Sequence, residues 1–217
     1  MKTQKQLRVL VACEYSGIVR DAFTALGHDA VSCDLLPTEK PGKHMETSIT
    51  GVLYNLGLGD CAGYDLMIAH PPCTYLCSSG LHWNKRRPER AKQTEEAIAF
   101  VKMLMDAPIP HIAIENPIGC LSTRVRKPEQ TVQPWQFGHA ESKATCLWLK
   151  NLPKLTPSQV VAKPECGHWD NQTPSGQNKL GPSPDRWKER SRTYPGIAAA
   201  MAQQWSDAVA TFNPNNQ

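Results

Sequence analysis

Short apolar runs alternate with amphipathic segments along the first half of the chain. Four runs are apolar, rich in β-branched residues and too short for helices, which predicts buried strands. They cover residues 7–12, 29–33, 66–69 and 112–114. Three segments between them carry apolar residues at helical spacing, at 18–26, 49–56 and 88–105. Strands that alternate with helices in this way predict a doubly wound, mostly parallel α/β sheet.

The pattern is weaker in the second half of the chain. Residues 144–149 form one more apolar run that predicts a strand, and residues 195–212 have helical periodicity. Between these two segments the chain is rich in Pro, Gly, Asn, Gln and Ser, which indicates irregular structure. We therefore expect a catalytic core at 1–150, an irregular excursion at 151–190 and a helix that returns to the core within 191–217.

The composition is that of an ordinary globular protein. A chain of 217 residues suits one α/β domain, and 40% hydrophobic with 20% charged residues is typical of that class. No apolar run has the length of a membrane span, and the run after the first residues is too short for a signal peptide. We expect a cytoplasmic protein that is not bound to a membrane. The net charge of +4 permits nucleic-acid binding without requiring it.

The eight cysteines are irregularly spaced, and several fall within or at the ends of predicted strands. Reduced thiols are more natural than disulfides at such positions. The chain has no Cys-x-x-Cys pair, and Cys166-Gly-His168 is an isolated cluster. Because four ligands at recognisable spacing are missing, we expect no bound metal.

Two predicted strands lead directly to reactive side chains. The strand at 66–69 continues through His70-Pro-Pro to Cys73, and the strand at 112–114 continues into Glu115 and Asn116. Ligands of open α/β sheets bind outside the carboxyl ends of the strands. The two prolines fix the backbone before Cys73, and partial burial would raise the pKa of Glu115 so that it donates a proton near neutrality. A thiol beside a carboxyl proton carrier can attack a pyrimidine ring.

The first strand and helix enclose a tight loop, Cys13-Glu-Tyr-Ser-Gly17, and Asp34 ends the second strand. An acidic residue about 20 positions beyond such a loop is the arrangement by which these folds hold a ribose. We assign no role to His70. Trp83 and Trp135 are candidates for stacking on a base, whereas Trp148 lies in a predicted strand and is expected in the core.

Together these strings resemble the cytosine-carbon-5 DNA methyltransferase family. That family has an S-adenosylmethionine loop after its first strand, a Pro-Cys nucleophile after its fourth and a Glu-Asn motif after its fifth. The matching strings are Val9–Gly17, Pro72-Cys73 and Glu115-Asn116, and residues 191–197 resemble the family's final cofactor-side segment. The resemblance covers about the first 120 and the last 25 residues. It is greatest to short methylase-like proteins of phages and prophages.

The resemblance implies a Rossmann-like, S-adenosylmethionine-dependent methyltransferase that acts on DNA, either single-stranded or with its target base flipped out of a duplex. Cys73 would attack carbon 6 of cytosine, Glu115 would bind ring nitrogen 3, and Asn116 would complete the catalytic set. The cofactor-binding residues would be Ala12, Cys13, Glu14, Tyr15, Ser16, Gly17, Asp34, Pro71 and Pro72. The substrate-binding residues would be Tyr75, Arg86, Arg87, Arg124 and Arg126.

The chain departs from the family pattern at three points, which keep two alternatives open. The cofactor loop has one glycine, the Gln-x-Arg-x-Arg motif is reduced to Arg124 and Arg126, and about 40 irregular residues replace the target-recognition domain. The first alternative is an exocyclic-amine methyltransferase, which stacks its base on an aromatic ring such as Tyr75 and needs no nucleophile. The second is a catalytically degenerate protein of this fold that binds nucleic acid or a host protein.

Overall fold

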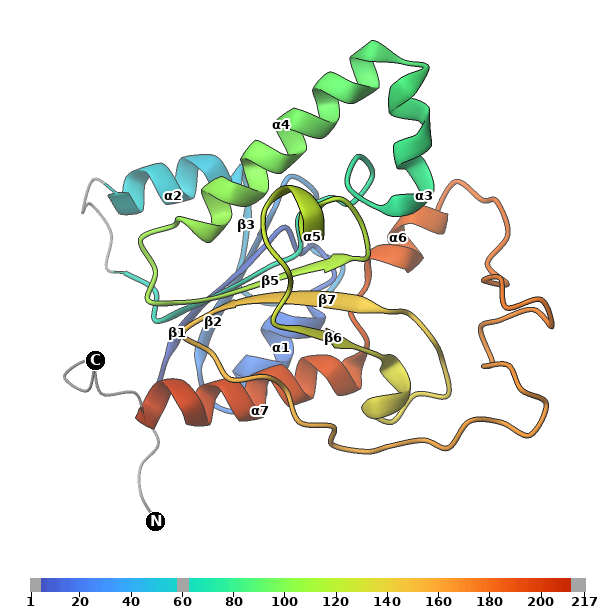
Figure 1. The fold of residues 1–217 in the computed structure, drawn as a ribbon. Helices are drawn as coiled ribbons and strands as arrows, with labels where there is room; N and C mark the ends of the chain where they lie inside the picture. The colour runs from blue at the N-terminus through green and yellow to red at the C-terminus, as the bar shows by residue number, and fades with distance from the viewer. Residues whose placement is uncertain (1–4, 58–62, 212–217) are drawn as a thin grey trace.

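Seven strands form one sheet at the centre of the computed structural model, which describes residues 5–57 and 63–211 (Figure 1). Their order across the sheet is β3-β2-β1-β4-β5-β7-β6. The strands are β1 (Arg8–Ala12), β2 (Asp29–Asp34), β3 (His44–Glu46), β4 (Leu66–Ala69), β5 (His111–Pro117), β6 (Gln130–Val132) and β7 (Thr145–Lys150).

Helices cover both faces of this sheet. They are α1 (Ile18–Ala25), α2 (Ile49–Gly57), α3 (Ser78–Leu81), α4 (Pro88–Met105), α5 (Leu121–Arg124), α6 (Arg186–Ser191) and α7 (Pro195–Thr211), with 3-10 turns η1 (His82–Lys85) and η2 (Pro134–Gln136). In Figure 1, α1 and α7 lie below the sheet and α2 and α4 lie above it. Among the described residues, no helix combines the length and apolar character needed to cross a membrane.

Each face of the sheet has its own hydrophobic core. Val9 and Val11 of β1 pack into the core with α1 and α7, whereas Leu10 and Ala12 pack into the core with α2 and α4. Successive side chains of a strand point to opposite faces, so a strand covered on both sides must be apolar throughout. This requirement explains why the central strands are continuous apolar runs in the sequence.

The predicted fold class, a doubly wound and mostly parallel α/β sheet, is confirmed. β1 to β5 run parallel along the sheet, and β7 is inserted antiparallel between β5 and β6. The chain winds outward from β1 through β2 to β3, and then returns to place β4 on the other side of β1. The order therefore reverses between β1 and β4, the point at which such sheets bind ligands.

Several elements differ from the sequence prediction, and β6, α3 and α5 are short elements that it did not include. β3 was not predicted, because a strand of three residues at the sheet edge has too little periodicity to detect. β5 extends to Pro117, since β7 pairs with it as far as Thr145, so Glu115 and Asn116 lie within the strand and not after it. The segment predicted to be irregular up to residue 190 contains most of α6.

Candidate active site

Cys73 and Glu115 come from neighbouring parallel strands and lie at the same edge of the sheet. Ala69 at the end of β4 is in register with Ile114 of β5, so Glu115 continues next to His70 and the loop to Cys73. The pKa of the partly buried Cys73 thiol is raised, first by a hydrogen bond with Cys77, then by burial and by nearby negative charges that include Glu115. The thiol loop and the carboxylate therefore share one edge of the sheet, and the negative charge of Glu115 contributes to the raised pKa of Cys73.

Cys73 forms a thiol pair with Cys77. The Cys77 N–H donates to the Cys73 carbonyl oxygen at 2.9 Å, and this single turn brings the two side chains together. Their shared hydrogen bond lowers the pKa of Cys77 and raises that of Cys73, and the Ser79 hydroxyl at 3.3 Å also favours the Cys77 thiolate. Two thiols that share a proton lose the first one more readily than an isolated cysteine does. One thiol of this pair is therefore ionised to a thiolate more readily than a single cysteine in the loop would be.

His70 is paired with Glu115, although the sequence analysis assigned it no role. Its Nδ1 lies 3.2 Å from Glu115 Oε2, and the two side chains are 8% and 15% exposed. Burial alone would raise the pKa of Glu115, but the hydrogen bond and charge of His70, with Lys143 and Thr145, lower it overall. The expectation of a raised pKa is therefore corrected, because it considered burial without these partners. Only the register between β4 and β5 reveals the pairing.

Asn116 holds the Cys73 loop in place. Its side chain is 1% exposed, and its Nδ2 donates to the Pro71 carbonyl oxygen at 2.8 Å. Its Oδ1 is buried and has no hydrogen-bond partner within the described structure. A side chain buried to this extent acts on the loop, and so it positions Pro71 and the residues that follow.

Backbone hydrogen bonds join the two loops that carry the thiol and the carboxylate. Cys120 N–H donates to Leu76 O at 2.9 Å, and Ser78 N–H donates to Ile118 O at 3.1 Å. Gly119 allows this close approach, because a Cβ there would lie 2.0 Å from the Leu76 oxygen. The two loops are therefore held together as one unit.

The loop after β1 contains two residues with a left-handed backbone, although it has only one glycine. Cys13 and Gly17 both have left-handed backbones, with φ of 58° and 72°. The Glu14 carboxylate is buried and accepts the N–H groups of Val19 at 2.7 Å and Arg20 at 3.2 Å. It thereby caps α1 and fixes the loop, in which Glu14, Tyr15 and Ser16 are buried and Cys13 is partly buried.

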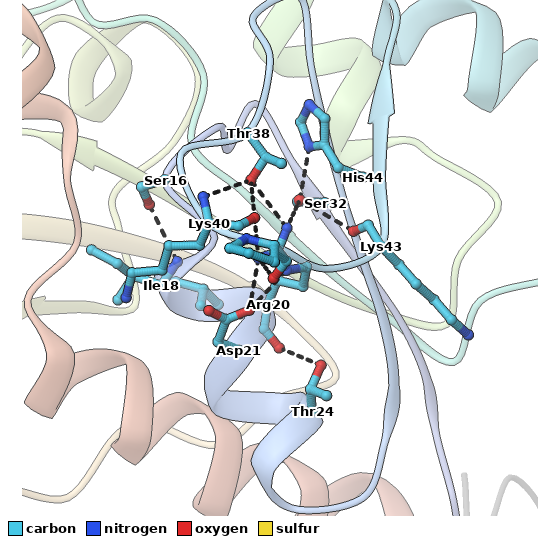
Figure 2. A network of polar contacts seen from close by, with 12 residues as sticks. Ser16, Ile18, Arg20, Asp21, Thr24, Ser32, Thr38, Lys40, Lys43 and His44 are labelled. Atoms are coloured by element: carbon cyan, nitrogen blue, oxygen red, sulfur yellow. Dashed lines mark hydrogen bonds and ion pairs between the residues drawn. The ribbon is translucent and has the colours of Figure 1, made fainter.

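Arg20 fastens the loop after β2 to α1, as Figure 2 shows. Its side chain is 1% exposed, and its guanidinium donates to Ser32 Oγ, Thr38 Oγ1 and the carbonyl oxygens of Lys40 and Pro41 at 3.1–3.2 Å. It also forms an ion pair with the neighbouring Asp21 at 2.8 Å. The sequence analysis missed this residue, although its position next to Val19 on the buried side of the helix was a possible signal.

Asp34 lies at the carboxyl end of β2, at the start of the loop that Arg20 holds. Its Oδ1 accepts the Leu36 N–H at 3.0 Å, and the adjacent Leu35 side chain is 73% exposed. A carboxylate and an exposed apolar side chain thus stand side by side at the edge where β1 and β2 end. This combination suits a ligand with hydroxyl groups next to a flat ring.

The segment around α6 lies over the loop after β1. The Tyr15 hydroxyl donates to Lys188 O at 3.1 Å and shares a hydrogen bond with Ser191 Oγ at 2.9 Å. Arg192 forms an ion pair with Glu39 at 2.7 Å. The end of the excursion therefore forms a wall of the site, a contact between residues 173 positions apart that no local pattern could predict.

The remaining cofactor candidates flank the switch point, and Tyr75 lies further along the Cys73 loop. Ala12 is buried at the end of β1, where its carbonyl oxygen accepts the His70 N–H at 2.9 Å. Pro71 is buried and Pro72 is exposed on the loop that leads to Cys73. The Tyr75 ring packs against the Arg90 guanidinium, 4.9 Å from its centroid, so one of its faces is already covered.

The arginine candidates divide into two pairs. Arg86 and Arg87 are exposed beside the Trp83 ring, with their guanidinium carbons 5.8 and 5.0 Å from its centroid. Arg124 instead forms an ion pair with Glu95 at 2.8 Å, and Arg126 pairs with Glu129. The second pair is thus neutralised by carboxylates, which leaves Arg86 and Arg87 better suited to meet a phosphate.

The two other tryptophan candidates have partners within the protein. Trp135 stacks on Trp169 with ring centroids 5.9 Å apart and planes 3° from parallel. Trp148 is 1% exposed and donates from Nε1 to Arg126 O at 2.7 Å, so its predicted place in the core is confirmed.

Comparisons with known proteins show similarity in fold to solved structures but none in sequence. The sequence matches no known protein family and no characterised protein. Among solved structures, the chain is similar to an E. coli protein encoded within a prophage, which is described as a proposed DNA modification methyltransferase. The identity is 12% and the TM-score 0.47, over 72% of this chain and 52% of that chain. This chain therefore spans about half the length of that structure.

Proposed function

We propose that this protein transfers a methyl group from S-adenosylmethionine to carbon 5 of cytosine in DNA, through a covalent adduct with Cys73. One observation supports the proposal above all others. Cys73 and Cys77 lie in the loop that follows β4, and Glu115 lies in the neighbouring β5, so thiols and carboxylate share the sheet edge next to the point where the strand order reverses. A nucleophile and a hydrogen-bonding carboxylate at this edge are the groups that covalent attack on a pyrimidine needs.

The residues around the ends of β1 and β2 fit the proposed cofactor. S-adenosylmethionine supplies an electrophilic methyl group when bound. Asp34 offers a carboxylate for ribose hydroxyls, and the exposed Leu35 next to it offers an apolar surface for the adenine ring. The turn at 13–17, with left-handed backbones at Cys13 and Gly17, would border the methionine part. Pro71 and Pro72 would border the same space from the β4 side.

The proposed chemistry begins at the thiol pair. The Cys77 thiolate, whose pKa is lowered to about 5, takes the proton of the Cys73 thiol. The Cys73 sulfur then forms a bond to carbon 6, which gives carbon 5 the electron density to take the methyl group. The proton on carbon 5 then leaves to solvent, the bond between carbon 6 and sulfur breaks, and the double bond of the ring is restored. Cys77 takes part as the neighbour that shares the thiol proton.

Glu115 would bind the opposite edge of the ring. Because its pKa is lowered, it is ionised at neutral pH and accepts a hydrogen bond from the 4-amino group of cytosine. Protonation of ring nitrogen 3 would require Glu115 to take up a proton first, and His70 Nδ1 lies 3.2 Å away to exchange one. We therefore assign His70 to the same catalytic group, as the residue that sets the charge of Glu115.

Trapping with 5-fluorocytosine separates the alternatives, because fluorine at carbon 5 cannot leave as a proton and the adduct persists. With S-adenosylmethionine and an oligonucleotide that contains 5-fluorocytosine, we expect the wild type to gain the mass of the strand at Cys73. Cys73→Ser should form no adduct, and Cys166→Ser, which removes an exposed cysteine, should react as the wild type does.

Two other outcomes would contradict the proposal. Methyl transfer that survives Cys73→Ser would indicate the exocyclic-amine reaction, although the contact of Tyr75 with Arg90 does not favour that interpretation. Neither adduct nor methylation, together with no calorimetric binding of S-adenosylmethionine at millimolar concentration, would indicate a protein that only binds.

A further inference from the structure

Two tryptophans are exposed on the surface around the candidate active site. Trp83 on η1 is 39% exposed and Trp187 on α6 is 50% exposed, whereas the other four tryptophans are buried or partly buried. Tryptophan is highly buried on average, and it is enriched where proteins contact partners. Each ring also contacts one aromatic side chain of the protein, His82 for Trp83 and Tyr15 for Trp187, with centroids 4.9 and 5.9 Å apart. Both contacts are tilted and not stacked, and the exposed part of each ring is a candidate for contact with a ligand outside the protein.

Positive side chains accompany both rings. Arg86 and Arg87 lie against Trp83, and the Lys188 ammonium is 5.7 Å from the centroid of the Trp187 ring. Lys188 is paired with the exposed Asp185 at 3.4 Å, but no ion pair within the described residues involves Arg86, Arg87 or Arg190. The surface around the rings is therefore basic as well as aromatic.

The two rings lie on elements near the thiol pair. α3 and η1 continue directly from the Cys73 loop, and Figure 1 shows α6 beside α3. The charge of Arg190, on α6, reaches both thiols: it opposes the raised pKa of Cys73 and adds to the lowered pKa of Cys77. Trp83 and Trp187 are thus carried by two elements that lie next to the thiols.

An exposed aromatic ring can stack only on a base that has a free face. Bases within a duplex are stacked above and below, whereas the bases of a single strand are free to stack on side chains. Arginines next to such rings neutralise the phosphates between the bases. A single strand also avoids the cost of extracting the target base from a duplex.

We propose that the protein binds single-stranded DNA across this surface, with Trp83 and Trp187 each stacking on an unpaired base on either side of Cys73. The inference rests on the proposed function, which places the target cytosine at Cys73, and it adds that the substrate is single-stranded. The 151–190 excursion is consistent with this assignment, because its last residues supply Trp187 and Arg190 and not a module for reading a duplex.

Fluorescence anisotropy tests the proposal without turnover. A labelled oligonucleotide of about 12 nucleotides, within the range of known single-strand sites, is titrated as a single strand and as a duplex. We expect the single strand to bind at least about tenfold more tightly at equal salt. Trp83→Ala and Trp187→Ala should each weaken that binding by roughly fivefold or more, as loss of one stacked base does.

Tyr54→Ala is the matched control, because Tyr54 is 68% exposed on α2, which lies far from α6 in Figure 1. It should bind as the wild type does, and circular dichroism should show that all three variants are folded. Equal or tighter binding of the duplex, or no effect of either tryptophan variant, would overturn the proposal. A strand of RNA that binds tenfold more tightly than the same DNA sequence would overturn the assignment to DNA.

The anisotropy titration and the 5-fluorocytosine trapping can fail independently of each other. Tight single-strand binding without a 5-fluorocytosine adduct would contradict methyl transfer alone. An adduct that forms on duplex DNA, with weak binding of single strands, would contradict the single-strand assignment alone.

Discussion

At the scale of single residues, the sequence identifies the ends of the strands but not the neighbours that set their chemistry. Cys73 and Glu115 were predictable, because the chain that follows an apolar run lies towards the carboxyl end of that strand, where such sheets bind ligands. Cys77 and His70 were not, because the first depends on one turn of backbone and the second on the register of β4 against β5. For this reason the pKa of Glu115 was predicted to be raised, whereas it is lowered.

The lowered pKa of Glu115 predicts a specific loss of stability in acid. Its carboxylate stabilises the fold above its unfolded pKa, which is near 4.5, and this contribution disappears as the pH falls through the lower pKa of the folded state. Glu115→Gln should therefore lose less stability than the wild type between about pH 7 and pH 3. Urea unfolding at a series of pH values measures the difference.

The control for this experiment is Glu96→Gln. Glu96 is 63% exposed and its contact with Lys92 is 3.8 Å long, so its removal should leave the wild-type slope of stability against pH unchanged. A slope for Glu115→Gln that equals that of the wild type would show that the His70 pairing contributes nothing to the fold.

At the scale of elements, the apolar pattern predicts those that are buried on one or two faces. The boundaries of β4 and α4 agree with the prediction, because both elements begin or end at a clear change in pattern. β3, β6 and α6 are short and partly exposed, so they carry little periodicity. The joining of the Cys73 and Glu115 loops depends on Gly119, whose role is visible only in the contact it allows.

Gly119→Ala should disrupt the site through the backbone. The added Cβ would lie 2.0 Å from Leu76 O and 2.9 Å from Cys77 Cα, so the two loops must separate. We expect a loss of about 2 kcal/mol or more in the free energy of unfolding, and slower adduct formation at Cys73.

Gly51→Ala provides the comparison. Gly51 lies in α2, and no atom stands within 4 Å of the position that a Cβ would take there, so alanine should stabilise the helix by about 0.5–1 kcal/mol. Thermal unfolding measures the stability of both variants. If Gly119→Ala is as stable as the wild type, the Cys73 and Glu115 loops are not tightly coupled.

At the scale of the whole molecule, the sequence predicts the layers of helices and sheet but not the contacts between residues far apart in the chain. The two helix layers and the parallel centre follow from the order and pattern of the elements. The antiparallel insertion of β7, and the return of α6 to Tyr15, join residues far apart in the chain and leave no local signal. Arg20 is a similar tie, because it links α1 to the loop that follows Asp34.

Arg20→Leu should destabilise the entire protein. It removes donors from four oxygens at 3.1–3.2 Å, those of Ser32, Thr38, Lys40 and Pro41, within a buried site. We expect a loss of about 2–4 kcal/mol, measured by urea unfolding. Arg86→Leu, on an exposed turn, should change stability by less than about 0.5 kcal/mol, and equal effects of the two changes would contradict the role of Arg20.

The contact of Tyr15 with α6 has a consequence for biosynthesis. A ribosome makes the turn at 13–17 early, but the partners of the Tyr15 hydroxyl, at Lys188 and Ser191, emerge only after most of the polypeptide. The sheet can assemble first, since domains fold progressively from the N-terminus as they are translated. This wall is thus made after every strand of the sheet, and only α7, which completes one hydrophobic core, follows it. A nascent chain would therefore gain this core and its competent site together, at the end of translation.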